Sequence, residues 1–269
     1  MATRRVDVGD GVLLFVQDLG DGPVVVLVGG FGMSHRLWDR QVRMLTEAGF
    51  RVLCVDQRGH GASDKPLDGY GIDDLGGDLT RVLDRVDVDR ATVVGHSFGG
   101  QVAFRLAARS DRVSGLVLVS SNGVRASRSQ DFPFGLEPDA MLPGLVEAEK
   151  GDRLASRRES IAGSFASRPD DLTVDWLMAS SLEMPSWVAL ACYETMLTTD
   201  LVDEIAAVDV PVLQVIGDRD PVHSARGARW LSERLADTRL IWLDDCGHFP
   251  MLEAPDAFDE ALLGFLANL

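Results

Sequence analysis

Short apolar runs alternate with helical patterns along the first half of the chain. Residues 24–28, 51–55 and 113–119 are almost continuously apolar, which is typical of strands covered on both faces of a parallel sheet. Around 36–47 and along 72–86, apolar residues instead recur at the spacing of an amphipathic helix. This alternation predicts an α/β fold with a doubly wound, mostly parallel sheet of about eight strands.

The two ends of the chain supply the remaining predicted strands. Residues 4–8 and 12–17 alternate on either side of a Gly-Asp-Gly turn, a pattern that favours a hairpin. Towards the C-terminus, 212–216 and 239–243 are predicted strands, and a closing helix follows with Phe258 on its apolar face.

The middle of the chain interrupts the alternation. About ninety residues without a strand-like run separate Ser121 from the strand at 212–216, and an unstructured connection of that length is uncommon inside a compact domain. We therefore predict a helical lid over 122–199, inserted into a core formed by 1–121 and 200–269. Within the lid, helices are expected near 145–161, 172–181 and 187–197.

One turn carries a recognisable chemical signal. Residues 93–100 read Val-Val-Gly-His-Ser-Phe-Gly-Gly, in which an apolar strand runs into a G-x-S-x-G turn and then a helix. This is the nucleophile elbow, whose sharp, strained turn exposes a serine oxygen at the edge of the sheet. The alternative is a glycine-rich turn with an incidental serine. We expect Ser97 to be a nucleophile.

A serine nucleophile needs a base and an acid that orients the base. In this kind of fold they follow the serine in the order acid, then histidine. Asp220 comes just after the predicted strand 212–216, and His248 comes after the strand 239–243. Competing carboxylates are Asp218, Asp244 and Asp245. We favour Asp220 as the acid and His248 as the base.

Composition narrows the possible partners. The 269 residues carry a formal charge of −16, which argues against nucleic acid or an anionic membrane as partner. No stretch approaches the roughly 18 apolar residues of a membrane span, and no signal peptide is evident, so we expect a cytoplasmic protein. The odd number of cysteines predicts no disulfide framework. No spacing of histidines and carboxylates suggests a metal site.

Several motifs together resemble a known family. They are Gly29-Gly30-Phe31-Gly32, Asp56-x-Arg58-Gly59-x-Gly61-x-Ser63, the elbow at 95–100, Gly217-x-x-Asp220-Pro221, and Gly247-His248-Phe249-Pro250 followed by Glu253 and Pro255. This set resembles the α/β-hydrolase fold family, in its branch of small bacterial esterases, enol-lactonases and non-haem haloperoxidases. The matching motifs run through nearly the whole predicted core and do not extend into the lid.

The resemblance implies a role for each matching residue. Ser97 would be the nucleophile, His248 the general base and later acid, and Asp220 the residue that orients His248. The backbone N–H groups of Phe31 and Phe98 would form the oxyanion hole. The chain departs from the family where relatives usually carry His-Gly and it has Gly29-Gly30, which leaves the pose of that loop open. No cofactor is implied.

The leading hypothesis is a serine hydrolase that cleaves a carboxylic ester or lactone of an apolar small molecule through an acyl-enzyme. One alternative is a hydrolase of C–C bonds in β-diketone-like compounds, which uses the same triad. Another is a non-hydrolytic protein of this fold: a ligand-binding receptor, a lyase or an oxygenase that uses only the His–Asp pair. An intact serine, acid and base favours the hydrolase.

The predicted lid is rich in aromatic residues and methionine, which favours an apolar substrate. We expect the substrate to contact Gly30, Trp176, Met178, Trp187 and Phe249. Four arginines of the lid are expected to form a solvated helix face, with recognition of a carboxylate as the alternative: Arg153, Arg157, Arg158 and Arg168.

Overall fold

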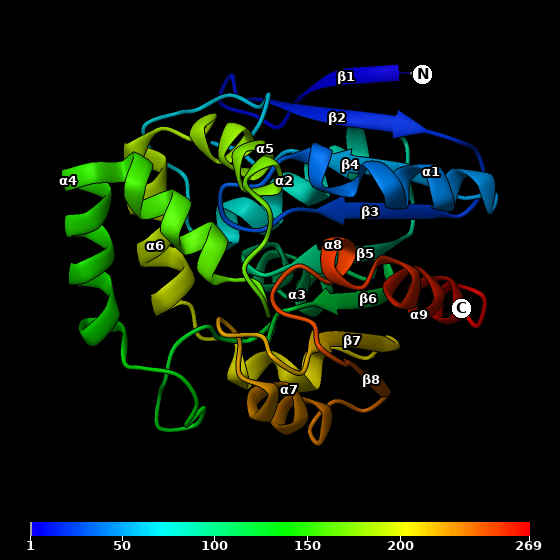
Figure 1. The fold of residues 1–269 in the computed structure, drawn as a ribbon. Coiled ribbons are helices and arrows are strands. Elements are labelled where there is room, and N and C mark those ends of the chain that lie inside the picture. Colours follow the sequence, from blue (N-terminus) through cyan, green and yellow to red (C-terminus); the bar gives the residue numbers. More distant parts are fainter. Residues whose placement is uncertain (1) are drawn as a thin grey trace.

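A computed structural model describes residues 2–269 of the chain. Within these residues eight strands form one sheet in the order β1-β2-β4-β3-β5-β6-β7-β8 (Figure 1). The strands are β1 (Ala2–Asp7), β2 (Leu13–Leu19), β3 (Val24–Val28), β4 (Arg51–Val55), β5 (Ala91–His96), β6 (Val113–Val119), β7 (Val212–Gly217) and β8 (Thr238–Leu243). The helices are η1 (His35–Trp38), α1 (Asp39–Glu47), α2 (Ile72–Arg85), α3 (Phe98–Arg109), α4 (Pro138–Gly163), α5 (Asp171–Leu182), α6 (Ser186–Thr198), η2 (Val202–Ala207), α7 (Ala225–Ser232), α8 (Pro250–Glu253) and α9 (Pro255–Leu266).

The sheet is mostly parallel, as the apolar runs predict. Strands β3 to β8 pair in parallel, and β2 alone runs antiparallel to its neighbours β1 and β4. The register places Val28 beside Gly95 and Gly95 beside Leu118, so the carboxyl ends of the central strands share one edge. Side chains that follow these strands are therefore brought together at that edge.

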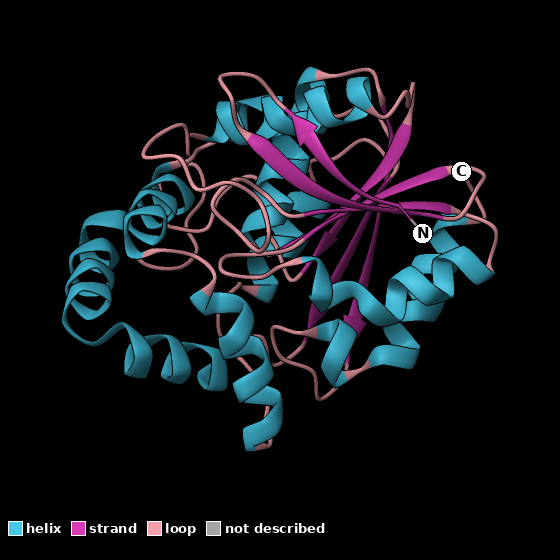
Figure 2. Cartoon of the chain, turned by 90° about the horizontal axis from the view of Figure 1, so that it is seen from above, coloured by secondary structure: helices cyan, strands magenta, loops and turns pink. Residues whose placement is uncertain are grey.

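Helices cover both faces of the twisted sheet (Figure 2). Along β3, Val26 and Val28 face one apolar cluster with α2 and α3, whereas Val25 and Leu27 face a second cluster with α1 and α9. Alternate residues of a strand point to opposite faces, so a strand buried on both sides must be apolar throughout. This explains why the central strands read as continuous apolar runs.

Three helices, α4, α5 and α6, occupy the chain between β6 and β7, and together they are called the α4–α6 segment below. The segment lies at the end of the sheet to which the parallel strands point (Figure 1). Helix α4 begins at Pro138, earlier than predicted, because the fixed φ of proline suits the first helical position. Its backbone leaves the helical conformation at Asp152 (φ −138°, ψ 81°), where two helical pieces meet.

Two further details concern the helices. The helix predicted near 36–47 is divided into the 3₁₀ turn η1 and α1. None of the helices in residues 2–269 combines the length and apolarity that a membrane span requires.

The core of β3 gives a direct test of this packing. Leu27 is fully buried, so we expect Leu27→Ala to lower the free energy of unfolding by about 2–5 kcal/mol through lost burial and a cavity. The control is Leu67→Ala, at a leucine that is 84% exposed, with a change within about 0.5 kcal/mol. Urea denaturation measures both; equal losses would contradict the two-sided core.

Candidate active site

Ser97 occupies a strained turn between β5 and α3. Its φ of +52° and ψ of −120° lie outside the regions that non-glycine residues ordinarily adopt. The chain packs so closely here that a Cβ atom at Gly95 would collide with the carbonyl of Gly99, and one at Gly99 with the carbonyl of Gly29. Glycine at these positions allows strand and helix to meet, and the turn presents the Ser97 side chain at the sheet edge.

The structure brings Ser97, His248 and Asp220 into one hydrogen-bonded chain. His248 lies in the loop after β8, and its Nε2 is 2.9 Å from Ser97 Oγ. Its Nδ1 is 3.0 and 3.1 Å from the two carboxylate oxygens of Asp220, in the loop after β7. The Asp220 carboxylate also accepts hydrogen bonds from the backbone N–H groups of Val222 and His223.

The carboxylate of Asp220 fixes the tautomer of His248. Burial alone would raise the pKa of Asp220, but the charge of His248 and its hydrogen bond, with a smaller contribution from His223, hold that pKa well below its usual range. A carboxylate only accepts hydrogen bonds, so His248 Nδ1 carries the proton that it donates to Asp220. In the neutral ring, Nε2 is then free to accept the proton of Ser97.

Two other buried histidines contact His248. His96 Nε2 donates to the carbonyl oxygen of His248 at 2.8 Å, which ties the elbow to the histidine loop. His223 stacks on the His248 ring with centroids 5.5 Å apart. Burial, followed by repulsion from a protonated His248, lowers the pKa of His96 to about 3 and that of His223 to about 4. Both rings are therefore neutral at neutral pH.

Glu253 holds the loop that carries His248. Its carboxylate accepts hydrogen bonds from the backbone N–H groups of Gly247 and Phe249, with N···O distances of 3.0 Å, and from that of Ala166 at 2.8 Å. Ala166 follows α4, so this carboxylate joins the histidine loop to the α4–α6 segment. The backbone N–H of His248 makes a second link by donating to the carbonyl of Ser164 at 2.9 Å.

The loop after β3 brings Phe31 close to Ser97. A Cβ atom at Gly30 would lie 2.9 Å from Ser97 Cβ, so a side chain there would push the loop away from the serine. The carbonyl of Gly29 accepts a hydrogen bond from the side chain of Gln57 at 2.9 Å. This hydrogen bond holds the loop at Gly29-Gly30, the position at which the chain departs from the family's usual His-Gly. Neither Phe31 N–H nor Phe98 N–H donates to a turn or loop acceptor among residues 2–269.

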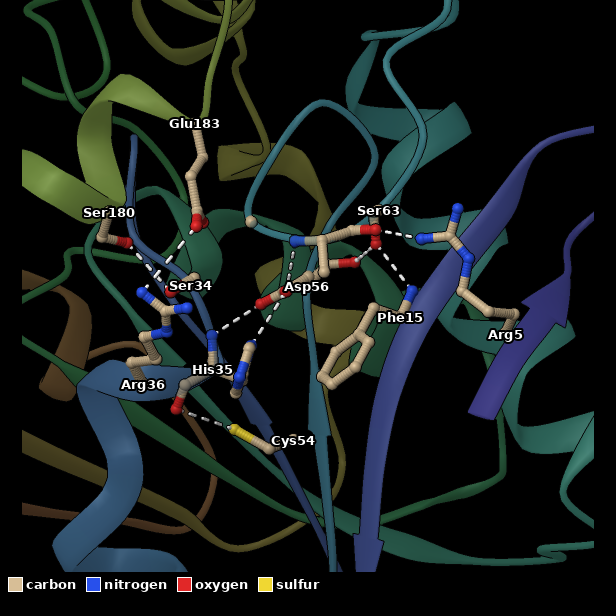
Figure 3. Close-up of polar contacts among 12 residues, drawn as sticks. Arg5, Phe15, Ser34, His35, Arg36, Cys54, Asp56, Ser63, Ser180 and Glu183 are labelled. Atoms are coloured by element: carbon tan, nitrogen blue, oxygen red, sulfur yellow. Dashed lines mark hydrogen bonds and ion pairs between the residues drawn. The ribbon is translucent and has the colours of Figure 1, made fainter. Parts of the chain in front are cut away.

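The residues that follow this loop are anchored on two sides (Figure 3). The buried Asp56 carboxylate accepts the backbone N–H of His35 at 2.6 Å and contacts its ring Nδ1 at 2.9 Å. On the other side, the Ser34 and Ser180 hydroxyls lie 2.9 Å apart, which links the loop to α5 (Figure 3). The position of Phe31 thus depends on both the core and the α4–α6 segment.

A cavity of about 200 Å³ opens at Ser97 and His248. Most of its wall is apolar, and its lining comprises Phe31, Met33, His96, Ser97, Met141, Leu145, Arg157, Ser160, Ile161, Ser164, Ser181, Tyr193, Met196, Val222, His248 and Phe249. The rings of Phe31 and Tyr193 stack with centroids 4.4 Å apart. The α4–α6 segment therefore supplies much of the wall opposite the serine.

Of the residues expected to contact a substrate, Phe249 lines this cavity and Gly30 lies against Ser97. The other three do not line the cavity. Trp176 is 38% exposed, Trp187 is 48% exposed and donates its indole N–H to the carbonyl of Pro66, and Met178 is packed in the core. Apolar residues lie on several faces of α5 and α6, so composition alone does not reveal which face lines the cavity.

One of the four arginines departs from the expected solvated face, whereas Arg168 is exposed and Arg153 is partly exposed. Arg157 is buried at the cavity wall, not on a solvated face. Arg158 is partly exposed and pairs with Asp175. No sequence signal marked Arg157 as buried, because its partner Glu149 lies on the other side of the break in α4.

Among residues 2–269, no group of three or more histidine, cysteine, aspartate or glutamate side chains is arranged to hold a metal ion. The side chains that meet at the site offer a hydroxyl, an imidazole and a carboxylate in one hydrogen-bonded chain.

The buried His223 gives a pH-dependent prediction. Its folded pKa of about 4 lies below the ordinary 6.5, so its stabilising contribution is complete above pH 6.5 and is lost as the pH falls towards 4. As the pH falls from 7 to 5, protonation of this group should lower the free energy of unfolding by about 2 kcal/mol. We expect His223→Gln to reduce the loss by that amount in urea denaturation; an unchanged pH dependence would contradict a neutral His223.

The chain resembles known proteins over nearly its whole length. Residues 23–255 match the family model of the alpha/beta hydrolase fold. The chain is 34% identical to the pimeloyl-[acyl-carrier protein] methyl ester esterase of Nitrosomonas europaea (91% of this chain, 96% of that one) and 26% identical to 3-oxoadipate enol-lactonase 2 of Acinetobacter baylyi (90% and 88%). The solved structure of the esterase EaEST from Exiguobacterium antarcticum superposes with a TM-score of 0.94, at 26% identity, over 99% of this chain and all of that one. The protein therefore belongs to the α/β hydrolase fold family.

Proposed function

We propose that this protein is a serine hydrolase that cleaves a carboxylic ester or lactone of a small apolar molecule through an acyl-enzyme. The observation that carries the proposal is the hydrogen-bonded chain from Ser97 Oγ through His248 to Asp220, with distances of 2.9 and 3.0 Å. This chain opens into a largely apolar cavity. Similarity to proteins named as an esterase and an enol-lactonase supports ester-bond chemistry.

The first half of the reaction forms the acyl-enzyme. Ser97 Oγ attacks the carbonyl carbon of the substrate while His248 Nε2 takes the hydroxyl proton. Asp220 keeps the imidazole in the required tautomer and stabilises the imidazolium that forms. When the tetrahedral intermediate collapses, His248 returns the proton to the leaving oxygen, and the alcohol departs.

The second half releases the acid. His248 removes a proton from a water molecule, which attacks the acyl carbon, and the second tetrahedral intermediate collapses to expel Ser97 Oγ. The proton then returns from His248 to Ser97, so serine and histidine recover their starting forms. The net reaction is hydrolysis: one water molecule is consumed, and the ester bond is cleaved to give an acid and an alcohol.

Each tetrahedral intermediate carries negative charge on the former carbonyl oxygen. We assign its stabilisation to the backbone N–H groups of Phe31 and Phe98, which flank the serine from the β3 loop and from the start of α3. Backbone donors of this kind are worth about 3 kcal/mol each. Because main-chain groups donate, the change from His-Gly to Gly29-Gly30 does not remove them.

We also propose that residues 122–199 act as a lid on a core of residues 1–121 and 200–269. The support is that α4 and α6 supply cavity residues from the side opposite the sheet edge, among them Met141, Ile161 and Tyr193. A covered cavity excludes bulk water from the reacting groups, which strengthens the electrostatic interactions that stabilise the transition state.

Replacing the nucleophile tests the reaction. We expect Ser97→Ala to lower kcat on p-nitrophenyl esters by at least about 10⁴-fold, because no acyl-enzyme forms. Release of p-nitrophenol at neutral pH, with acyl chains of increasing length, provides the measurement. Circular dichroism of the variant serves as the control for folding.

Two outcomes would contradict the proposal. Undiminished hydrolysis by a folded Ser97→Ala protein would exclude Ser97 as nucleophile. A folded wild-type protein that hydrolyses no ester or lactone would move the assignment to C–C bond hydrolysis, which uses the same triad, or to a non-hydrolytic role.

The loop after β3 gives a second test. Gly30→Ala places a methyl group against Ser97 and should displace Phe31, lowering kcat by about 10²-fold with a smaller effect on KM. Gly264→Ala, at a glycine whose Cβ would meet nothing within 4 Å, is the matched control and should leave kcat unchanged. Equal kcat values for the two variants would argue against a role for this loop.

A further inference from the structure

The charge inside the cavity restricts what the site can accept. Among the described residues of the lining, Arg157 is the one with a permanent charge. A free arginine in such a position would attract a substrate carboxylate, often through two parallel hydrogen bonds. Whether the guanidinium is free therefore decides the charge of the acyl group that fits.

Arg157 is already paired on almost every side. Its Nε and Nη2 donate to the two carboxylate oxygens of Glu149 at 3.0 and 2.6 Å. Its Nη1 donates to the carbonyls of Ser181 and Met184. Four of the five N–H donors of a guanidinium are thus used. The side chains of Arg157 and Glu149 are 2% and 0% exposed.

The pair exists because α4 is broken. Glu149 and Arg157 are eight residues apart, which corresponds to about 12 Å along an unbroken helix. The non-helical backbone at Asp152 folds the two pieces of α4 so that both side chains meet. Glu149 also accepts a hydrogen bond from the hydroxyl of Ser186 at the start of α6. The pair consequently joins both pieces of α4 to the end of α5 and the start of α6.

Arg157 cannot turn to a ligand without leaving Glu149 buried and unpaired. Removing one partner of a buried ion pair is strongly unfavourable, because the remaining charge has lost its solvation and its counter-ion. A substrate carboxylate at the cavity wall would approach an Arg157 guanidinium whose charge Glu149 already neutralises. The negative charge of Glu149 would also repel it. The wall therefore behaves as uncharged.

Apart from His248 and the neutral His96 beside it, the other polar side chains of the wall are neutral hydroxyls. Burial, reinforced by the charge of Glu149, raises the pKa of Tyr193 to about 12, so its hydroxyl stays protonated at neutral pH. That hydroxyl makes no side-chain hydrogen bond within the described part of the chain and lines the cavity together with Ser160 and Ser181. Hydroxyls can pair with a neutral carbonyl or amide, but they do not compensate a buried charge.

The cavity is also small. Its volume is about 200 Å³. Sites for drug-sized ligands are usually about 300–1,000 Å³. The group that enters therefore has few heavy atoms.

Resting on the proposed function, we infer that the site selects esters with a compact, uncharged acyl group and rejects those whose acyl group ends in a carboxylate, because Glu149 neutralises Arg157 at the cavity wall. This specificity separates the chain from a hydrolase that uses a cavity arginine to recognise a dicarboxylic half-ester.

Three methyl esters of matched shape test the inference with the wild-type protein. Methyl 4-methylpentanoate is neutral and apolar, methyl succinamate is neutral and polar, and monomethyl succinate has the same shape with a terminal carboxylate. Methanol release at pH 7.5 gives kcat/KM for each. We expect the carboxylate ester to be about 100-fold worse than the apolar ester, and the amide to lie within about tenfold of it.

The outcomes separate the inference from the proposed function. A ratio of apolar to carboxylate ester below 10 overturns the inference while leaving ester hydrolysis intact. A ratio above 10 supports it. Turnover of none of the esters tested, p-nitrophenyl esters included, overturns the proposed function and the inference with it.

Glu149→Gln tests the cause of the selectivity. Removing the counter-charge leaves Arg157 with an unpaired charge at the wall, so the ratio should shift at least tenfold towards monomethyl succinate. Glu147→Gln, the same change at an exposed position of α4, is the matched control and should leave the ratio unchanged. An unchanged ratio in a folded Glu149→Gln protein overturns the inference. If that variant does not fold, the wild-type comparison of esters decides.

Discussion

The close approach of strand and helix around Ser97 is the constraint on which the site depends. A serine can be held at φ +52° here because Gly95 has no Cβ atom, which would collide with Gly99 and Gly100 at the start of α3. This geometry lifts the hydroxyl to the edge where β7 and β8 also end. Asp220 and His248 then need only short loops to reach it, and the charge on Asp220 fixes the tautomer of His248.

The catalytic groups and the cavity are built as one unit. The α4–α6 segment is hydrogen-bonded to the loop that carries Phe31 through Ser180, and to the loop that carries His248 through Ser164 and Ala166. Inside the segment, the buried Arg157–Glu149 pair fixes the wall that faces the serine. The segment therefore contacts both catalytic loops directly.

The sequence predicts the parts of this structure that local rules govern. Continuous apolar runs identify the parallel strands because these are buried on both faces, and the elbow motif locates Ser97 because only such a turn requires that pattern of glycines. The wall of the cavity follows no such rule. Trp176 and Trp187 are exposed, whereas Arg157 is buried, because tertiary packing decides which helix faces meet. Gly151 and Asp152, whose carboxylate accepts a hydrogen bond from Ala155 N–H, mark the break in α4 but do not reveal what the second piece packs against.

The central claim is that Ser97 is an activated nucleophile. A small, neutral organophosphonate with a p-nitrophenol leaving group reacts covalently with such a serine, and mass spectrometry locates the adduct. The account predicts one adduct per chain, on the peptide that contains Ser97, with release of one equivalent of p-nitrophenol. A folded protein that gains no adduct, or that is modified at another residue while Ser97 stays free, would contradict it.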